Sequence, residues 1–134
     1  SVCSYHNMIH KVHHKLFIIG SLLATEKQDT FEILPQIKNE DIITLEKNID
    51  QLTEPLEPLK NFILPSGHPA SAMAHVARTL CRRSERRTVE VSFKDPRLNL
   101  SLIYLNRLSD LLFTLARFIN LKTNTAEVLW DKSE

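Results

Sequence analysis

The chain has 134 residues, a length that suits one compact domain. Hydrophobic residues make up 43% and charged residues 25%, which is typical of a globular protein and excludes a disordered tail. The formal net charge of +1 excludes the strong overall basicity of many nucleic-acid-binding proteins. Only two glycines are present, too few for a Gly-rich phosphate-binding loop within these residues. No apolar run approaches the ~20 residues that a membrane-spanning helix needs.

Apolar residues recur every three or four positions in four segments, a spacing typical of amphipathic helices. The predicted helices cover about residues 7–24, 39–53, 69–91 and 95–121. Residues 25–38 have no clear period and predict a loop. Segment 61–67 is expected to be extended or loop-like, because Pro65 disfavours helix in the residue before it. No segment predicts a strand, so we expect one all-α domain over residues 1–134, an antiparallel helix bundle.

Local signals place the helix ends. Asn39 is the expected N-cap of the second helix, and Pro55 prevents that helix from continuing. Pro69 suits the first turn of the third helix, and Asp95-Pro96 marks the start of the fourth. The fourth helix is apolar on most of its faces, which predicts a buried position in the bundle or at a subunit interface.

One stripe of the third helix carries small residues, which allow two helix backbones to approach closely. The stripe consists of Ala70, Ala74, Ala77, Cys81 and Ser84. The other cysteine, Cys3, lies far from Cys81, and the pair matches no metal or redox spacing. Free thiols in a reducing, cytoplasmic compartment are therefore expected.

Arginine is concentrated in one short segment of the third helix. No arginine precedes Arg78, and five fall within ten residues: Arg78, Arg82, Arg83, Arg86 and Arg87. Three of them are four residues apart and stack on one helix face. Guanidinium groups suit bidentate contact with phosphate or carboxylate, so the stripe indicates an anion site in which Glu85 holds one arginine. A solvated basic face with local ion pairs is the alternative.

The predicted buried fourth helix contains a polar group made of Asn106, Arg107, Ser109 and Asp110. Buried polar side chains are destabilising by about 1–3 kcal/mol each unless they are paired. Two interpretations stay open. Either Arg107 and Asp110 form an internal bridge that positions helices, or the amide of Asn106 contacts a ligand.

The histidines have no clear functional pattern. His6, His10 and His14 are four residues apart, a spacing at which two histidines share a metal, but no carboxylate or cysteine accompanies them, so an exposed helix face including His13 is expected. His75 is expected to be a hydrogen-bonded structural residue. Phe62, beside Pro65, is expected to pack in a core unless it serves a ligand.

Three ordered sequence blocks closely resemble the PduO-type ATP:cob(I)alamin adenosyltransferases. They are FILPSG at residues 62–67, AHVARTLCRRSER at 74–86 and LNRLSDLLFTLAR at 105–117, and EVLW at 127–130 is also similar. The resemblance implies a five-helix bundle, of which this chain carries four helices, assembled as a homotrimer with active sites at subunit interfaces. It implies transfer of the 5′-deoxyadenosyl group of ATP to cob(I)alamin with release of triphosphate.

The resemblance also assigns expected roles to residues. Arg78 and Arg82 are the expected catalytic residues, with Arg78 paired across the interface to an aspartate outside this chain. ATP contacts are expected from Arg82, Arg83, Ser84, Glu85, Arg86 and Asn106. Phe62 would lie against the corrin and help displace its lower axial ligand. ATP would bind with Mg²⁺, cobalamin would be the substrate, and no protein metal site is expected.

The chain departs from the family pattern at its start. The family's N-terminal Thr-Lys/Arg-x-Gly-Asp-x-Gly-x-Thr loop, which wraps ATP, and its first helix are not among these 134 residues. We therefore expect the chain to be N-terminally incomplete and inactive alone. The alternative function is a non-catalytic cobalamin-binding or assembly module. Expected partners are a flavoprotein reductase and an adenosylcobalamin-dependent enzyme, and neither nucleic acid nor membrane is expected as a partner. The expected compartment is the cytoplasm, or the mitochondrial matrix in a eukaryote.

Overall fold

The computed structural model describes the backbone of residues 2–133 and the side chains of residues 5–133. Its elements are α1 (Val2–Leu23), α2 (Gln28–Ile33), α3 (Asn39–Thr53), α4 (Pro69–Ser92), the 3₁₀ turn η1 (Pro96–Leu98) and α5 (Asn99–Lys122). The four long helices confirm the predicted all-α class. The described residues contain one isolated β-bridge and no strand. The thiol of Cys3, expected to be free, lies outside the described side chains.

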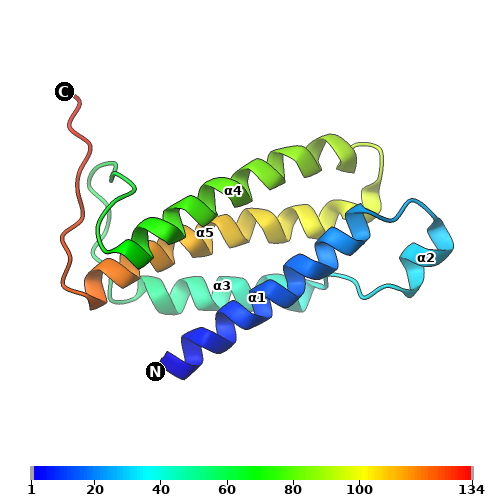
Figure 1. Ribbon diagram of the computed structural model, residues 1–134, viewed down its shortest axis with the longest axis horizontal. Coiled ribbons are helices and arrows are strands. Elements are labelled where there is room, and N and C mark those ends of the chain that lie inside the picture. Colours follow the sequence, from blue (N-terminus) through cyan, green and yellow to red (C-terminus); the bar gives the residue numbers. More distant parts are fainter. Residues whose placement is uncertain (1, 134) are drawn as a thin grey trace.

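The long helices form an elongated bundle around α5 (Figure 1). Helix α4 packs along one side of α5 and α3 packs along another, while α1 crosses the front of the bundle obliquely. Leu108 and Leu111 of α5 are each only 2% exposed and lie in the same apolar cluster as Leu22 of α1 and Leu45 of α3. The predicted burial of the fourth helix is thus confirmed, and α5 is the centre of the core.

The loop at residues 25–38 and the start of α3 differ from the prediction. Residues 25–38 are not entirely loop, because α2 buries Phe31 beneath the guanidinium of Arg97, which lies 4.0 Å from the ring centroid. The N-cap of α3 is Lys38 rather than Asn39. The carboxylate of Asp41 accepts a hydrogen bond from the Lys38 N–H at 2.8 Å, which fixes the helix start one residue earlier.

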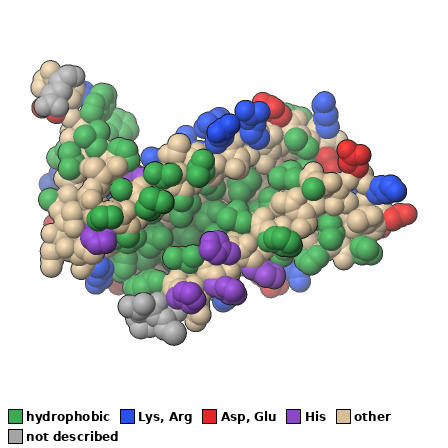
Figure 2. Space-filling model, viewed as in Figure 1, with side chains coloured by type: hydrophobic (Ala, Val, Ile, Leu, Met, Phe, Trp, Pro, Cys, Tyr) green, Lys and Arg blue, Asp and Glu red, His purple; other side chains and the backbone are tan. Residues whose placement is uncertain are grey.

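Helix α1 stands apart from α4 and leaves an apolar groove between them. The groove has a volume of about 750 Å³, and the predicted stripe of small residues on α4 lines it together with Met8, Val12 and Leu16 of α1. Figure 2 shows hydrophobic side chains gathered between these two helices. Towards the C-terminal end of α1, Ile18, Ile19 and Leu22 are buried in the core.

Two segments outside the helices meet at one end of the bundle (Figure 1). Ile63, in the loop that precedes α4, forms the β-bridge with Leu129. The Leu64 N–H donates to the Val128 carbonyl at 2.7 Å, and the Trp130 N–H donates to the Phe62 carbonyl at 2.8 Å. The segment predicted as extended is therefore held by the C-terminal residues. No described helix has the length and hydropathy needed to cross a membrane.

Candidate functional site

A cavity of about 370 Å³ lies where the loop before α4 meets α4 and α5. Its walls are Leu59, Asn61, Phe62 and Ile63 from the loop, Arg78 and Arg82 from α4, and Ser109, Asp110 and Phe113 from α5. The cavity therefore brings together the candidate corrin residue and both candidate catalytic arginines. It also includes half of the polar group of α5, and we call it the arginine cavity.

Phe62 does not pack in the core, so that alternative is wrong. Its side chain is 69% exposed at the rim of the arginine cavity. The only described aromatic contact of Phe62 is an edge-to-face one with Trp130, at a centroid distance of 5.9 Å. An exposed aromatic ring beside a cavity is available to a flat apolar ligand.

Arg78 is half-buried against aromatic side chains. Its guanidinium carbon lies 5.4 Å from the ring centroid of Phe113, and its Nε is buried without a hydrogen-bond partner among the described residues. His75, one turn earlier on α4, packs edge-on against Phe113 at 6.0 Å. Burial, and secondarily the charge of Arg78, lower the pKa of His75. The site thus contains one partly desolvated cation beside a neutral imidazole.

His75 differs from its prediction in one respect. It is buried, being 3% exposed, as a structural residue should be. Both of its ring nitrogens, however, lack a hydrogen-bond partner among the residues that the structure describes. Its fit comes from the aromatic contact with Phe113 rather than from the expected hydrogen bond.

The arginines of residues 78–87 form no ion pair with any described residue. Figure 2 shows Lys and Arg side chains gathered along the edge formed by α4. The expected contact between Glu85 and an arginine is absent from residues 5–133. Instead, Glu85 accepts a hydrogen bond from the amide of Asn106 at 2.9 Å. Four of these arginines are exposed, so the solvated face of the alternative is present, but its local ion pairs are absent among the described residues. The guanidinium groups are therefore accessible to an anion.

The polar group of α5 does not form the predicted internal bridge. Arg107 lies 3.4 Å from Glu46 of α3 and donates to the Asn106 side-chain carbonyl at 2.7 Å. Asp110 is exposed and lines the arginine cavity. Asn106 is therefore oriented by Arg107 on one side and by Glu85 on the other, one helical turn from the cavity wall.

The candidate ATP residues do not all lie on one face of α4. Arg83 and Ser84 line a second groove, between α4 and α1, together with Arg87. The hydroxyl of Ser84 donates to the Leu80 carbonyl within the helix at 3.0 Å. Arg86 is exposed and follows Arg82 by one turn. The structure thus groups Arg82 with the cavity and separates Arg83 and Ser84 from it.

Two residues at the site had no predicted role. Phe113 forms a cavity wall and contacts both Arg78 and His75. Its position three residues after Asp110 places it on the same helix face, a signal that the sequence offered. Trp130 contacts Phe62, but no local pattern connects residues so far apart in sequence.

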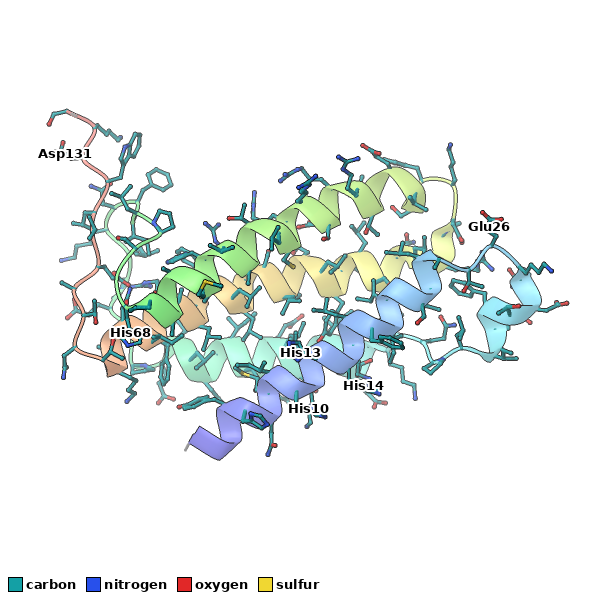
Figure 3. The ribbon with its side chains drawn as sticks, viewed as in Figure 1. His10, His13, His14, Glu26, His68 and Asp131 are labelled. Atoms are coloured by element: carbon teal, nitrogen blue, oxygen red, sulfur yellow. The ribbon has the colours of Figure 1, made fainter. Side chains whose placement is uncertain are left out.

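The candidate metal histidines lie along α1, away from the arginine cavity (Figure 3). His6, His10, His13 and His14 are all exposed, as predicted. Among the described residues, no group of three or more His, Cys, Asp or Glu side chains is arranged to hold a metal ion.

Comparison with known proteins agrees with the geometry. Residues 2–119 match the family model described as cobalamin adenosyltransferase. The corrinoid adenosyltransferase of Bacillus subtilis is 37% identical over 124 residues, which are 91% of this chain and 62% of that protein. The human corrinoid adenosyltransferase MMAB is 39% identical over 136 residues, covering 94% of this chain and 52% of the relative. The chain thus spans between about half and three-fifths of these relatives.

Solved structures also resemble this fold. A variant of a PduO-type ATP:corrinoid adenosyltransferase from Lactobacillus reuteri, complexed with cobalamin and ATP, has a TM-score of 0.86 and 32% identity. The similarity covers 94% of this chain and 70% of that one. Because the family model covers most of the chain and both sequence and fold agree with it, this chain belongs to the cobalamin adenosyltransferase family.

Proposed function

We propose that the protein transfers the 5′-deoxyadenosyl group of ATP to cob(I)alamin, forming adenosylcobalamin and releasing triphosphate. The observation that carries the proposal is the arginine cavity. It places an exposed aromatic ring, Phe62, beside two guanidinium groups that have no ion-pair partner among the described residues. The relatives from Bacillus subtilis and human are named corrinoid adenosyltransferases, which supports the same reaction.

The chemistry needs no nucleophile from the protein. The Co(I) centre of the substrate attacks C5′ of ATP, so that a Co–C bond forms while the C5′–O bond breaks and triphosphate leaves. The protein must hold the two substrates in line and stabilise the charge that develops on the leaving group. This requirement accounts for a site rich in arginine.

We assign the triphosphate to the arginine stripe. Arg82 is exposed at the cavity and is free to make bidentate contacts with phosphate oxygens. Arg78, half-buried against Phe113, supplies a fixed positive charge. We expect it to pair with a carboxylate of another subunit. Arg86 extends the stripe by one turn, and Asn106, oriented by Glu85, offers an amide to the nucleotide. Arg83 and Ser84 would contribute from the adjacent face of α4.

Phe62 is assigned to the corrin. Its exposed ring provides an apolar surface against the lower face of the macrocycle, where it competes with the axial ligand. Loss of that ligand makes the cobalt easier to reduce to Co(I). Mg²⁺ would bind chiefly through the triphosphate oxygens and water, as it commonly does with nucleotides. Asp110 is the one carboxylate among the described walls of the arginine cavity, which fits that limited role.

The assembly and its partners belong to the same proposal. We propose a homotrimer with the arginine cavity at each subunit interface, supplied with reduced cobalamin by a flavoprotein reductase. The product would pass to an adenosylcobalamin-dependent enzyme. The compartment would be the cytoplasm, or the mitochondrial matrix in a eukaryotic host.

The test uses the full-length gene product with ATP, Mg²⁺ and chemically reduced cobalamin under anaerobic conditions. The visible spectrum of the corrin reports formation of adenosylcobalamin. Alkylation that is lost in Asn106→Ala supports the reaction and this site. Corrin binding without alkylation favours the alternative, a cobalamin-binding or assembly module. Absence of any interaction with corrin or ATP contradicts the proposal.

A further inference from the structure

Asn120, near the end of α5, makes side-chain hydrogen bonds to a loop rather than to its own helix. The side chain is buried, with the residue 2% exposed. Its carbonyl accepts from the His68 N–H at 3.0 Å, and its amide donates to the Ser66 carbonyl at 3.3 Å. Figure 3 labels His68 at the start of α4, next to the end of α5. One side chain thus satisfies the backbone on both sides of Gly67.

The backbone conformation and the small size of Gly67 allow this contact. Its φ of +119° lies in the region that residues other than glycine rarely adopt. A Cβ at this position would come within 2.5 Å of the Asn120 side-chain oxygen and 2.6 Å of its nitrogen. The loop backbone therefore lies directly on the amide group. Such close approach is possible only because glycine has no side chain.

The contact fixes one end of the segment that carries Phe62. Ser66 follows Phe62 by four residues, and the other restraint on this segment is its pairing with Val128 and Trp130. Phe62 itself is 69% exposed and contacts only Trp130 among the described aromatic residues, so little else holds its ring at the cavity. The position of Phe62 consequently depends both on the pairing at residues 62 and 64 and on where the backbone at residues 66–68 is held.

We propose that Asn120 is a positioning residue for Phe62. By holding residues 66–68 against the end of α5, it sets the position of the aromatic ring at the arginine cavity and thereby affects the binding of the corrin. The expected effect on cobalamin binding rests on the proposed function. The coupling between Asn120 and the Phe62–Trp130 contact does not.

The test compares Asn120→Ala with Ser71→Ala in the full-length gene product. Ser71 is a matched control because it is also buried and its hydroxyl donates to the Ala116 carbonyl at 2.8 Å, joining α4 to α5 without touching the loop. Asn120→Ala should raise the KM for cobalamin about fivefold or more and leave the KM for ATP within about twofold. Ser71→Ala should shift neither KM, whatever it does to the melting temperature.

A spectroscopic readout is independent of activity. Trp130 is the only tryptophan in the 134 residues and contacts Phe62, so its emission reports the position of the loop. Asn120→Ala should shift the Trp130 emission in folded protein, and Ser71→Ala should not. Any tryptophan encoded outside these residues is replaced by phenylalanine in all variants.

A double-mutant cycle with Phe62→Ala decides whether Asn120 acts through that ring. If it does, Asn120→Ala has no further effect on the KM for cobalamin once Phe62 is gone. Additive effects, equal changes in both KM values, or an unchanged Trp130 emission would overturn the proposal. Should the unmodified protein form no adenosylcobalamin, the proposed function fails, and the emission shift alone supports or overturns the clamp.

Discussion

Replacement of Arg82 by alanine tests whether the arginine cavity binds the leaving triphosphate. Arg82 is exposed and forms no ion pair among the described residues. Removal of an exposed, unpaired side chain usually changes the free energy of unfolding by no more than about 0.5 kcal/mol. We therefore expect Arg82→Ala to fold with nearly unchanged stability, so that any loss of activity reports on the site.

The expected loss follows from the role of the guanidinium group. A preorganised donor aimed at the charge that develops in the transition state typically contributes about 2.7–4 kcal/mol, or 10²–10³-fold in kcat. Arg82→Ala should lose activity in that range. Arg82→Lys keeps the charge but not the planar, bidentate geometry, and so we expect a smaller loss.

Arg87→Ala provides the matched control. Arg87 lies on the same helix and is also exposed, but it lines the groove beside α1 instead of the arginine cavity. Both variants remove one positive charge from α4, so a general electrostatic effect would appear in both. The assay is adenosylcobalamin formation under anaerobic conditions with saturating ATP. The reasoning is refuted if Arg82→Ala stays within about threefold of the unmodified protein, or if Arg87→Ala loses as much activity.

Three further predictions concern buried groups. Burial and the charge of Arg78 lower the pKa of His75, so this histidine is protonated more readily in the unfolded chain than in the folded one. The free energy of unfolding should therefore fall as the pH drops below 6.5. Urea titrations of His75→Leu should show a weaker dependence of the free energy of unfolding on pH. Burial raises the pKa of the Cys81 thiol to about 11, so in a Cys3→Ser background native protein should react with iodoacetamide far more slowly than urea-unfolded protein. Equal rates in the two states would contradict this. The Glu127 Oε1 atom lies 2.7 Å from Nε of the largely buried Arg117. Glu127→Gln should therefore reduce the free energy of unfolding by about 1–3 kcal/mol. An unchanged urea midpoint would show that this ion pair does not stabilise the fold.

The long helices were predictable because their signals are local. Periodic apolar residues, Pro69 in a first turn and Asp95 before a proline act within a few positions, and each long helix ends within one residue of its predicted C-terminus. Two predicted starts are wrong: α1 begins at Val2 rather than near residue 7, and Asp95-Pro96 begins the turn η1, so that α5 begins at Asn99. Helix α2 was missed because six residues are too short to establish a period. Its stability depends on the contact between Phe31 and Arg97, which no local pattern reveals.

Helix geometry alone predicts that the arginines of α4 lie on different faces of the helix. Consecutive residues in an α-helix point about 100° apart, so Arg82 and Arg83 cannot share a face. Helix geometry does not predict that Phe62 lies near Arg78, because this proximity depends on the path of the loop before α4. The sequence resemblance predicted that proximity. The additional contact with Trp130 needed the structure, since it joins two irregular segments.

Arg78 and His75 are two basic groups beside Phe113, a wall of the arginine cavity. Two basic groups one turn apart against the same aromatic ring cannot both be charged without strong repulsion. Burial is the main cause of the lowered pKa of His75, and the charge of Arg78, which stays protonated at physiological pH, lowers it further. Of this pair, Arg78 is the permanent cation; it is partly withdrawn from water, and its buried Nε is unpaired among the described residues. Such a group gains more from an arriving phosphate or carboxylate than an exposed arginine does, because the dielectric screening around it is weaker.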